Sequence, residues 1–303
     1  MKLAVCRKDA RTFLGVVTDT GLVDATSWAE AARCGTSEPS AAPGWDALLP
    51  LLADDTSSLR RHIADLRHGR IDMETVELLP PLTRPGKIVA VGTNYLDHAI
   101  EVGRNGSTAG SHTGVSAAPR LLGIFPSSIA GPSSAVPVPP SVKKLDFEAE
   151  LAVVIGKPGK NIQEQFALSH VLGYMTANDF SAREYQFDIN PPQTTRAKSM
   201  DGFTPLGPWV TTADELADPQ NLAVRCWVNG ELMQDGHTSQ MQFGVAELIA
   251  RISEQFSLHT GDLILTGTPA GCGAFRKPPR YLRPGDIVRT HIDHLGELVT
   301  TIA

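Results

Sequence analysis

A continuous apolar run over residues 151–156 constrains the fold of this chain more than any other segment. Such a run indicates a strand that is buried on both faces, so other layers must cover both sides of its sheet. Further strands are predicted over residues 87–91, 171–177, 222–228, 262–266 and 287–292, and helices over residues 94–102 and 245–256. These elements do not alternate as they do in a Rossmann fold or a TIM barrel. We therefore predict an α+β fold that is mostly β.

The length of 303 residues suits two folding units. Pro80, Pro81 and Pro85 interrupt the pattern between them. The short strands and helical segments before this point are predicted over residues 3–7, 13–18, 22–25, 45–53 and 57–67. We therefore predict a small N-terminal α+β domain over residues 1–80 and a strand-rich domain over residues 81–303.

The composition excludes several classes of protein. Lys and Arg number 27 against 33 Asp and Glu, so the net charge is −6, and no long basic run is present to bind nucleic acid. No stretch approaches the roughly 18 apolar residues of a membrane span, and charges follow the N-terminus too early for a signal peptide. The four cysteines form no Cys-x-x-Cys pair, which argues against thiol redox chemistry and zinc ribbons. We expect a cytoplasmic protein without nucleic-acid or membrane partners.

Three carboxylates lie beside apolar strands. Glu148 and Glu150 adjoin the run over residues 151–156 and, two positions apart on a strand, point to the same face. Asp179 follows the strand predicted over residues 171–177. Three carboxylates without histidine or cysteine suit a hard cation such as Mg²⁺, Mn²⁺ or Ca²⁺. A solvated strand face is an equally good interpretation of Glu148 and Glu150 from their spacing alone.

Arg183 and Gln186 lie three residues apart, shortly after Asp179. If residues 181–187 form a helical turn, both side chains share a face next to Asp179. An arginine in that position can bind a carboxylate through two hydrogen bonds. The alternative is an ordinary surface arginine.

The chain carries an ordered set of motifs from about Lys87 to its C-terminus. They include Val91-Gly92-Thr93-Asn94-Tyr95-Leu96-Asp97-His98, Asp146-Phe147-Glu148-Ala149-Glu150-Leu151, Asn178-Asp179-Phe180-Ser181-Ala182-Arg183, Lys198-Ser199-Met200-Asp201-Gly202-Phe203 and Thr266-Gly267-Thr268-Pro269-Ala270-Gly271. This set resembles the fumarylacetoacetate hydrolase family, in its branch of acylpyruvases and 2-hydroxyhepta-2,4-diene-1,7-dioate isomerases. The resemblance implies a mixed β-sandwich roll for residues 81–303, which is usually a homodimer.

The resemblance also implies roles for individual residues. The metal, Mg²⁺ or Mn²⁺ with Ca²⁺ as a further choice, is expected on Glu148, Glu150 and Asp179. His98 matches the catalytic histidine, and Glu101 lies three residues later on the same helical face.

Four further residues are expected to contact the substrate. Lys198 matches a lysine that faces the developing negative charge of the substrate, and Thr268 lies in the loop that contacts its carboxylate. Arg183 and Gln186 are expected to complete the substrate-binding set.

The implied substrates are small 2-oxo or β-diketo acids. The leading hypothesis is a hydrolase that cleaves a carbon–carbon bond in an acylpyruvate or fumarylacetoacetate-like acid, as in aromatic catabolism. His98 and Glu101 would activate water, while the metal and Lys198 stabilise the enolate that is expelled. The first alternative is a decarboxylase, isomerase or tautomerase that uses the same site. The second is a binding protein that has lost its chemistry.

Several positions depart from the family pattern. Many relatives carry lysine where this chain has Ile124, tryptophan where it has Thr194 and glycine where it has Ala197. The segment over residues 103–118 is rich in Gly, Ser and Thr. It is expected to form a mobile lid that closes over a bound 2-oxo acid, and a surface insertion without a role is the alternative.

Overall fold

The computed structural model describes residues 1–33, 44–66, 69–104 and 116–303. Most of the lid predicted over residues 103–118 lies outside the described residues. Among the described residues, no helix combines the length and the apolar character that crossing a membrane requires.

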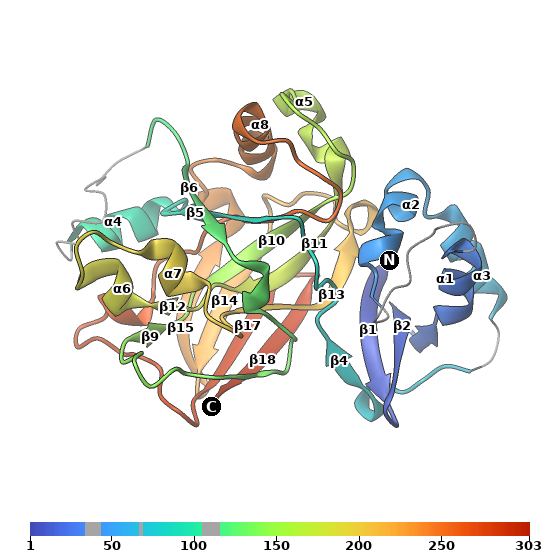
Figure 1. Cartoon of the computed structure of the whole chain (residues 1–303), viewed down its shortest axis with the longest axis horizontal. Helices are drawn as coiled ribbons and strands as arrows, with labels where there is room; N and C mark the ends of the chain where they lie inside the picture. Colours follow the sequence, from blue (N-terminus) through green and yellow to red (C-terminus); the bar gives the residue numbers. More distant parts are fainter. Residues whose placement is uncertain (34–43, 67–68, 105–115) are drawn as a thin grey trace.

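One large sheet extends from the N-terminal strands to the opposite end of the molecule (Figure 1). Its strands are, in spatial order, β3 (Gly21–Asp24), β2 (Arg11–Thr18), β1 (Lys2–Lys8), β13 (Thr204–Thr212), β11 (Val171–Asn178), β10 (Ala149–Ile155), β16 (Leu263–Leu265), β5 (Ile88–Gly92) and β6 (Arg120–Ile124), with β4 (Glu77–Leu79) beside β1 and β7 (Ile129–Ala130) beside β13. Neighbouring strands are antiparallel except for the parallel pairs β16–β5 and β13–β7.

A second sheet packs against one face of the first. It contains, in order, β15 (Glu231–His237), β14 (Ala223–Val228), β17 (Ile287–Ile292), β18 (Gly296–Ile302) and β8 (Ala135–Val136), and the short strands β9 (Leu145–Asp146) and β12 (Ser181–Ala182) pair separately. The turn between β14 and β15 places Asn229 at φ 51° and Gly230 at φ 85°, the left-handed backbone that an Asn-Gly hairpin turn requires. The predicted α+β, mostly β fold is confirmed.

Strand β10 lies between two hydrophobic cores. Leu151 and Val153 face the core that the second sheet covers, which includes Val224. Ala152 and Val154 face the other core, which is built with residues of the N-terminal unit. All seven residues of β10 are buried. The strand that the apolar run predicts, with both faces covered, is confirmed.

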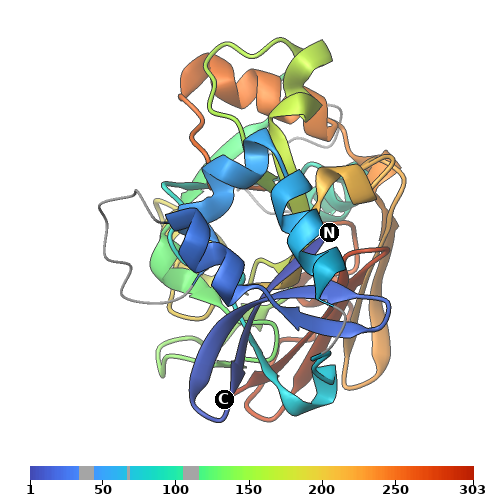
Figure 2. The same ribbon diagram turned by 90° about the vertical axis from the view of Figure 1, so that its right-hand side faces the viewer.

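The helices lie in three groups. The first contains α1 (Thr26–Arg33), α2 (Leu49–Asp54) and α3 (Ser57–Asp65) at the N-terminal end, and the second contains α5 (Glu164–Ala167) and α8 (Val245–Gln255), side by side above them in Figure 2. The third group, at the opposite end of the molecule in Figure 1, contains α4 (Leu96–Arg104), α6 (Arg183–Phe187) and α7 (Thr194–Lys198). The sequence reasoning did not anticipate α1 or the strands β6, β13 and β18. The third group lies beside the site described below.

The N-terminal strands continue the large sheet. Strand β1 pairs with β13, so Leu3 lies opposite Val210. The N-terminal ammonium of Met1 donates a hydrogen bond to Thr212 and lies 2.9 Å from Glu215 Oε1. The division into residues 1–80 and 81–303 stays a prediction, since the two parts share this sheet and one hydrophobic core.

Candidate metal centre and active site

The three predicted carboxylates converge because strands β10 and β11 are antiparallel neighbours. Ala149, which lies between Glu148 and Glu150, pairs with Asn178, and Asp179 is the residue directly after Asn178. The backbone N–H of Asp179 donates to the carbonyl of Glu148 at 2.9 Å. One carboxylate oxygen from each of the three side chains lies within 4.8 Å of the others.

Burial and mutual charge dominate the electrostatics of this trio. Glu148, Glu150 and Asp179 are 5%, 2% and 1% exposed, so a solvated strand face is the wrong interpretation. Burial, together with the neighbouring carboxylates, raises the pKa of Glu150 well above its ordinary value and that of Asp179 to about 6. Burial acts on Glu148 in the same direction, but the charges of Lys198 and Arg183 outweigh it and lower the pKa of Glu148 to about 2.

The donor set fits a hard divalent cation. Lys198, at the end of α7, places Nζ 2.6 Å from Glu148 Oε2 and 2.5 Å from Asp179 Oδ2, so one positive charge balances part of the negative charge of the trio. Among the described residues, the buried Asp179 Oδ1 has no hydrogen-bond partner. Three converging carboxylates with an unpaired oxygen are suited to Mg²⁺ or Mn²⁺.

The loop after β16 completes the wall around Glu150. Gly267 donates its backbone N–H to Glu150 Oε2 at 2.8 Å and adopts φ +94°, a left-handed conformation that favours glycine. A Cβ at this position would lie 2.8 Å from the Cβ of Asn94. Asn94 in turn donates through Nδ2 to the carbonyl of Thr266 at 2.8 Å, which ties this loop to the start of α4.

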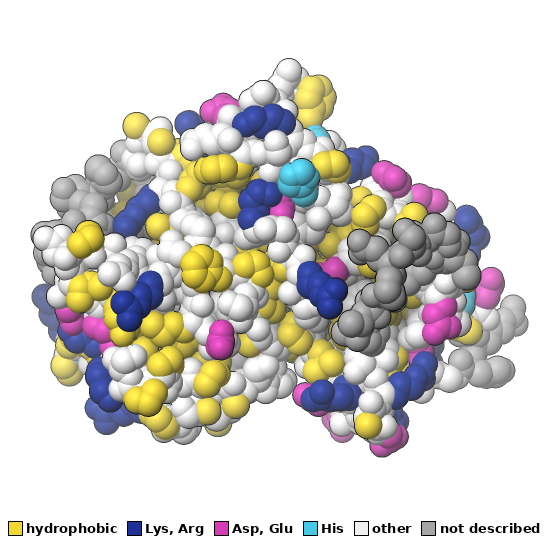
Figure 3. All heavy atoms as spheres, in the orientation of Figure 1, with side chains coloured by type: hydrophobic (Ala, Val, Ile, Leu, Met, Phe, Trp, Pro, Cys, Tyr) yellow, Lys and Arg dark blue, Asp and Glu magenta, His cyan; other side chains and the backbone are white. Residues whose placement is uncertain are grey.

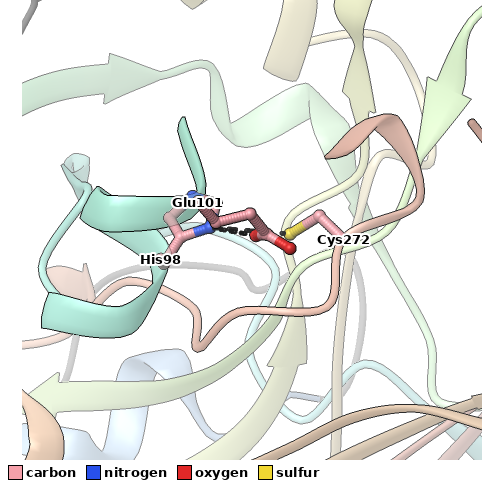
Figure 4. Close-up of side chains that lie close together, drawn as sticks. All are labelled: His98, Glu101 and Cys272. Carbon is pink, nitrogen blue, oxygen red and sulfur yellow. Dashed lines mark hydrogen bonds and ion pairs between the residues drawn. The ribbon is translucent and has the colours of Figure 1, made fainter. Parts of the chain in front are cut away.

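His98 and Glu101 lie one turn apart on α4 and form the predicted pair. His98 Nδ1 lies 3.1 Å from Glu101 Oε2, and the other carboxylate oxygen of Glu101 accepts from the backbone N–H of Gly271 at 3.0 Å. His98 is 4% exposed, and its ring packs against the Phe275 ring in a T-shaped arrangement with 5.6 Å between the centroids. Figure 4 shows the two side chains directed toward Cys272, which comes from the loop after β16. The catalytic roles of His98 and Glu101 stay predictions.

Arg183 is buried rather than on the surface. Its Nε donates to Asp146 Oδ2 at 2.8 Å, and its terminal nitrogens lie 2.9 Å from Gln186 Oε1 and 2.7 Å from Glu148 Oε1. Much of its hydrogen-bonding capacity therefore serves protein groups, and a contact from Arg183 or Gln186 to substrate stays a prediction. The sequence reasoning did not single out Asp146, although it lies in the same motif as Glu148.

Thr268 is held by a residue that sequence reasoning also missed. Its hydroxyl accepts from Gln234 Nε2 at 2.7 Å, and the same amide group donates to the carbonyl of Pro269 at 2.8 Å. Gln234 Oε1 accepts from the backbone N–H of Ala149 at 3.0 Å. Gln234 therefore connects β15 to the start of β10 and to the Thr268 loop.

Many of these side chains line one cavity, whose empty volume is about 550 Å³ when the solvent space at its mouth is included. The wall contains His98, Lys198, Thr268, Thr194, Phe187 and Arg120, together with the three carboxylates. Arg120, on β6, was not predicted, because no sequence pattern indicated a strand there. Of the departures from the family pattern, Thr194 lines the cavity, whereas Ile124 and Ala197 are buried.

The comparisons with known proteins agree with this arrangement. Residues 87–303 match the sequence model of one family, fumarylacetoacetate (FAA) hydrolase C-terminal. The chain is 45% identical over 228 residues to the mitochondrial oxaloacetate tautomerase fahd2 of Xenopus laevis, which covers 75% of this chain and 69% of the relative.

Two solved structures share the fold. A fumarylacetoacetate hydrolase from Exiguobacterium antarcticum is 32% identical with a TM-score of 0.79, and the match covers 100% of this chain and 99% of the other. The maleylpyruvate hydrolase of Sphingobium sp. SYK-6, in complex with manganese(II) and pyruvate, is 28% identical with a TM-score of 0.77 and the same coverage. Because residues 87–303 match the family model and the fold is shared with these structures, the chain belongs to the fumarylacetoacetate hydrolase family.

Proposed function

We propose that the protein is a divalent-metal-dependent tautomerase of small dicarboxylic 2-oxo acids of the oxaloacetate type. The observation that carries this proposal is the convergence on one cavity of the carboxylate trio, the Lys198 ammonium and His98, whose imidazole is hydrogen-bonded to Glu101. The sequence alone favoured hydrolysis of a carbon–carbon bond. The 45% identity to an oxaloacetate tautomerase supports placing tautomerisation first.

The proposed reaction moves one proton within the substrate. A cation held by Glu148, Glu150 and Asp179 would polarise the 2-oxo group and favour negative charge on its oxygen. Since Glu101 faces Nδ1 of His98, the other ring nitrogen, Nε2, is the proposed base. His98 removes a proton from the carbon next to the 2-oxo group, the C–H electron pair forms the carbon–carbon double bond, and the carbonyl π pair moves to the oxygen. The protonated imidazole then returns its proton to that oxygen, which completes the enol and restores the base.

Lys198 contributes positive charge at the site of this change. Its ammonium lies between two carboxylates of the trio and lines the cavity. A preformed positive charge beside an oxygen that becomes negative lowers the barrier, because it does not have to reorganise during the reaction.

The surroundings of His98 favour a reaction that consumes no water. Val102, Phe275 and Cys272 form a buried apolar cluster against which Phe187 packs, and the Phe275 ring makes a T-shaped contact with His98. Such a wall limits the number of water molecules beside the imidazole. Tautomerisation needs no water molecule as a reactant, whereas hydrolysis does.

Arg120 is the proposed partner for the second carboxylate of the substrate. It lies opposite Gly92 in the pair of strands β5 and β6, and its side chain crosses this glycine. A Cβ at residue 92 would lie only 3.3 Å from Cδ of Arg120, so the glycine leaves room for the arginine. Because Arg120 lines the cavity, its guanidinium suits the distal carboxylate of a four-carbon dicarboxylic acid.

Carbon–carbon bond hydrolysis is the second candidate. The His98–Glu101 hydrogen bond is the arrangement of a base that can also activate water. The 28% identity to a maleylpyruvate hydrolase supports this alternative. Decarboxylation or isomerisation would use the same enolate, and a silent binding protein would show none of these reactions.

The homodimer and the cytoplasmic location stay predictions. In the space-filling view, apolar side chains are spread over the half of the face where β6, β17 and β18 lie (Figure 3). Three exposed apolar residues lie here: Phe125 directly after β6, Ile287 in β17 and Val299 in β18. An apolar surface of this kind supports self-association.

The proposal is tested by incubating the protein with oxaloacetate and with acetylpyruvate, each with Mg²⁺, with Mn²⁺ and with a chelator. Enol–keto exchange of oxaloacetate is followed by ultraviolet absorption, decarboxylation by carbon dioxide release and hydrolysis by acetate release. We expect metal-dependent exchange that Asp179→Asn abolishes, while Asp235→Asn on the exposed face of β15 leaves it unchanged. Acetate release without accelerated exchange would replace the proposal with the hydrolase. If none of these reactions is accelerated, the remaining hypothesis is a binding protein without catalytic activity.

A further inference from the structure

A second group of possible metal ligands contains His98, Glu101 and Cys272 and is separate from the carboxylate trio. Nδ1 of His98 lies 3.1 Å from Glu101 Oε2 and 4.0 Å from the sulfur of Cys272. One ligand atom from each of these residues lies within 4.8 Å of the other two. Figure 4 shows the Cys272 sulfur directed at the carboxylate and the imidazole, although the loop after β16 is far from α4 in sequence.

We propose that His98, Glu101 and Cys272 form a second metal site, which takes a thiophilic cation of the zinc class and inhibits the enzyme when it is filled. Zinc binds imidazole nitrogen at about 2.0 Å and thiolate sulfur at about 2.3 Å, so tetrahedral donors lie about 3.3–3.6 Å apart. The observed separations of 3.1 Å and 4.0 Å lie within about 0.5 Å of these values. Small side-chain movements would therefore complete the coordination.

The two sites differ in the chemistry of their donors. Glu148, Glu150 and Asp179 offer oxygen alone, which suits Mg²⁺ and Mn²⁺. The second group offers nitrogen, oxygen and sulfur, the set that favours zinc. One chain can therefore hold two different metals at neighbouring positions.

The surroundings of the second group hold its ligands in place. The backbone N–H of Gly271 fixes one oxygen of Glu101, so the other is directed at His98. Gln234 Nε2 lies 3.8 Å from the Cys272 sulfur. His98 also borders the cavity, which gives a cation a route to the group. Coordination would release the thiol proton of Cys272 to solvent.

Inhibition follows from the role that we propose for His98, and this part of the inference rests on the proposed function. A metal on Nδ1 replaces the hydrogen bond to Glu101 and withdraws electron density from the imidazole. Nε2 then becomes a weaker base toward the substrate. The inhibition would not require loss of Mn²⁺ from the carboxylate trio.

The binding part is tested without any measurement of activity. Co²⁺, which replaces zinc in such sites, is added to the protein saturated with Mg²⁺, and thiolate-to-cobalt charge-transfer absorption is recorded. Zinc bound per chain is measured after dialysis in excess Mn²⁺. We expect the absorption band and one additional zinc in the wild type. Both should be lost in Cys272→Ser and Cys272→Ala, with zinc affinity lower by more than about 10²-fold.

Cys226→Ser is the matched control, since Cys226 is another buried cysteine but lies in β14, outside the cluster. This variant should keep the band and the additional zinc. Glu150→Gln separates the two sites, because it should lose Mn²⁺ and keep the band. Absence of the band in the wild type, or its persistence in both Cys272 variants, would overturn the zinc site.

The inhibitory part is measured with each variant relative to its own Mn²⁺-dependent rate. The zinc concentration that halves this rate should rise by more than about 10-fold in Cys272→Ser and stay unchanged in Cys226→Ser. Equal inhibition in all three proteins would contradict regulation through this site. If no reaction is detected, the proposed function fails, and the absorption measurement still decides whether the zinc site exists.

Discussion

Lys198 Nζ and Glu148 Oε2 lie 2.6 Å apart, and both side chains are buried. The same ammonium lies 2.5 Å from Asp179 Oδ2, so it shares two carboxylates with the cation that the trio is suited to hold. A lysine in this position has two opposing effects. Its charge lowers the pKa of the neighbouring carboxyls against the effect of burial, and it repels the metal that binds there.

We expect Lys198→Met to bind Mn²⁺ more tightly than the wild type and to react more slowly. Two unit charges 4 Å apart interact by about 4 kcal/mol at an effective dielectric constant of 20, so a gain in affinity of about 10-fold is a modest expectation. Loss of the charge at the substrate oxygen should lower kcat by about 10²–10³-fold. Calorimetric titration with Mn²⁺ and steady-state kinetics measure the two effects.

The control for this variant is Lys144→Met, because Lys144 forms an ion pair with Asp188 on the surface. It should change neither quantity. Weaker Mn²⁺ binding in Lys198→Met would show that the lysine supports the metal rather than competing with it.

Metal affinity should depend on pH through Asp179. Burial raises the pKa of this carboxyl to about 6, so a proton occupies it at lower pH and must leave when the metal binds. Mn²⁺ affinity should therefore fall by about 10-fold per pH unit below about 6. Electron paramagnetic resonance of free Mn²⁺ measures this dependence, and a constant affinity between pH 5 and 7 would contradict it.

The free energy of unfolding of the metal-free protein should depend on pH in the opposite direction and fall as the pH rises. An unfolded aspartate has a pKa of about 4, so between about pH 4 and 6 the folded chain holds more protons at Asp179 than the unfolded chain does. The contribution of this group to the free energy of unfolding is present at low pH and is lost as the pH rises to about 6. Chemical denaturation of the wild type and of Asp179→Asn at several pH values isolates it.

His98→Ala and Glu101→Gln should affect the rate but not the metal. Removal of a general base costs about 10²–10⁴-fold in rate, and Glu101→Gln should cost less because the imidazole stays in place. Mn²⁺ affinity should stay within a factor of about three of the wild type in Glu101→Gln, since the carboxylate trio is unchanged. An unaltered rate in His98→Ala would remove this histidine from the reaction.

Arg120→Leu should change the choice of substrate. If the guanidinium binds the distal carboxylate, KM for oxaloacetate should rise by about 10–10²-fold, because a charged hydrogen bond contributes about 1.5–3 kcal/mol. The reaction of a 2-oxo acid without a second carboxylate should keep its KM. Arg120→Lys should recover part of the loss, and an equal rise for both substrates would point to a structural role.

Much of the β scaffold follows from local patterns. The apolar run over residues 151–156 predicts β10, and the hairpin between β14 and β15 turns at Asn229-Gly230, a pair that favours such a turn by itself. Glu148 and Glu150 are identified as neighbours because side chains alternate along a strand. These features depend on residues close in sequence, and local geometry therefore determines them.

The composition of the site depended on the tertiary structure. The spacing of Glu148 and Glu150 alone did not decide whether they face water or a cation. In the structure, β11 brings Asp179 to them and α7 brings Lys198. Arg120 joined the cavity because β6 pairs with β5.

Cys272 lies beside His98, 174 residues away in sequence, and this contact exists because the loop after β16 packs against α4. Spacing along the chain determines which face a side chain takes within one element. Which elements share a cavity is decided by long-range packing of the cores, and no local pattern in this sequence encodes that choice.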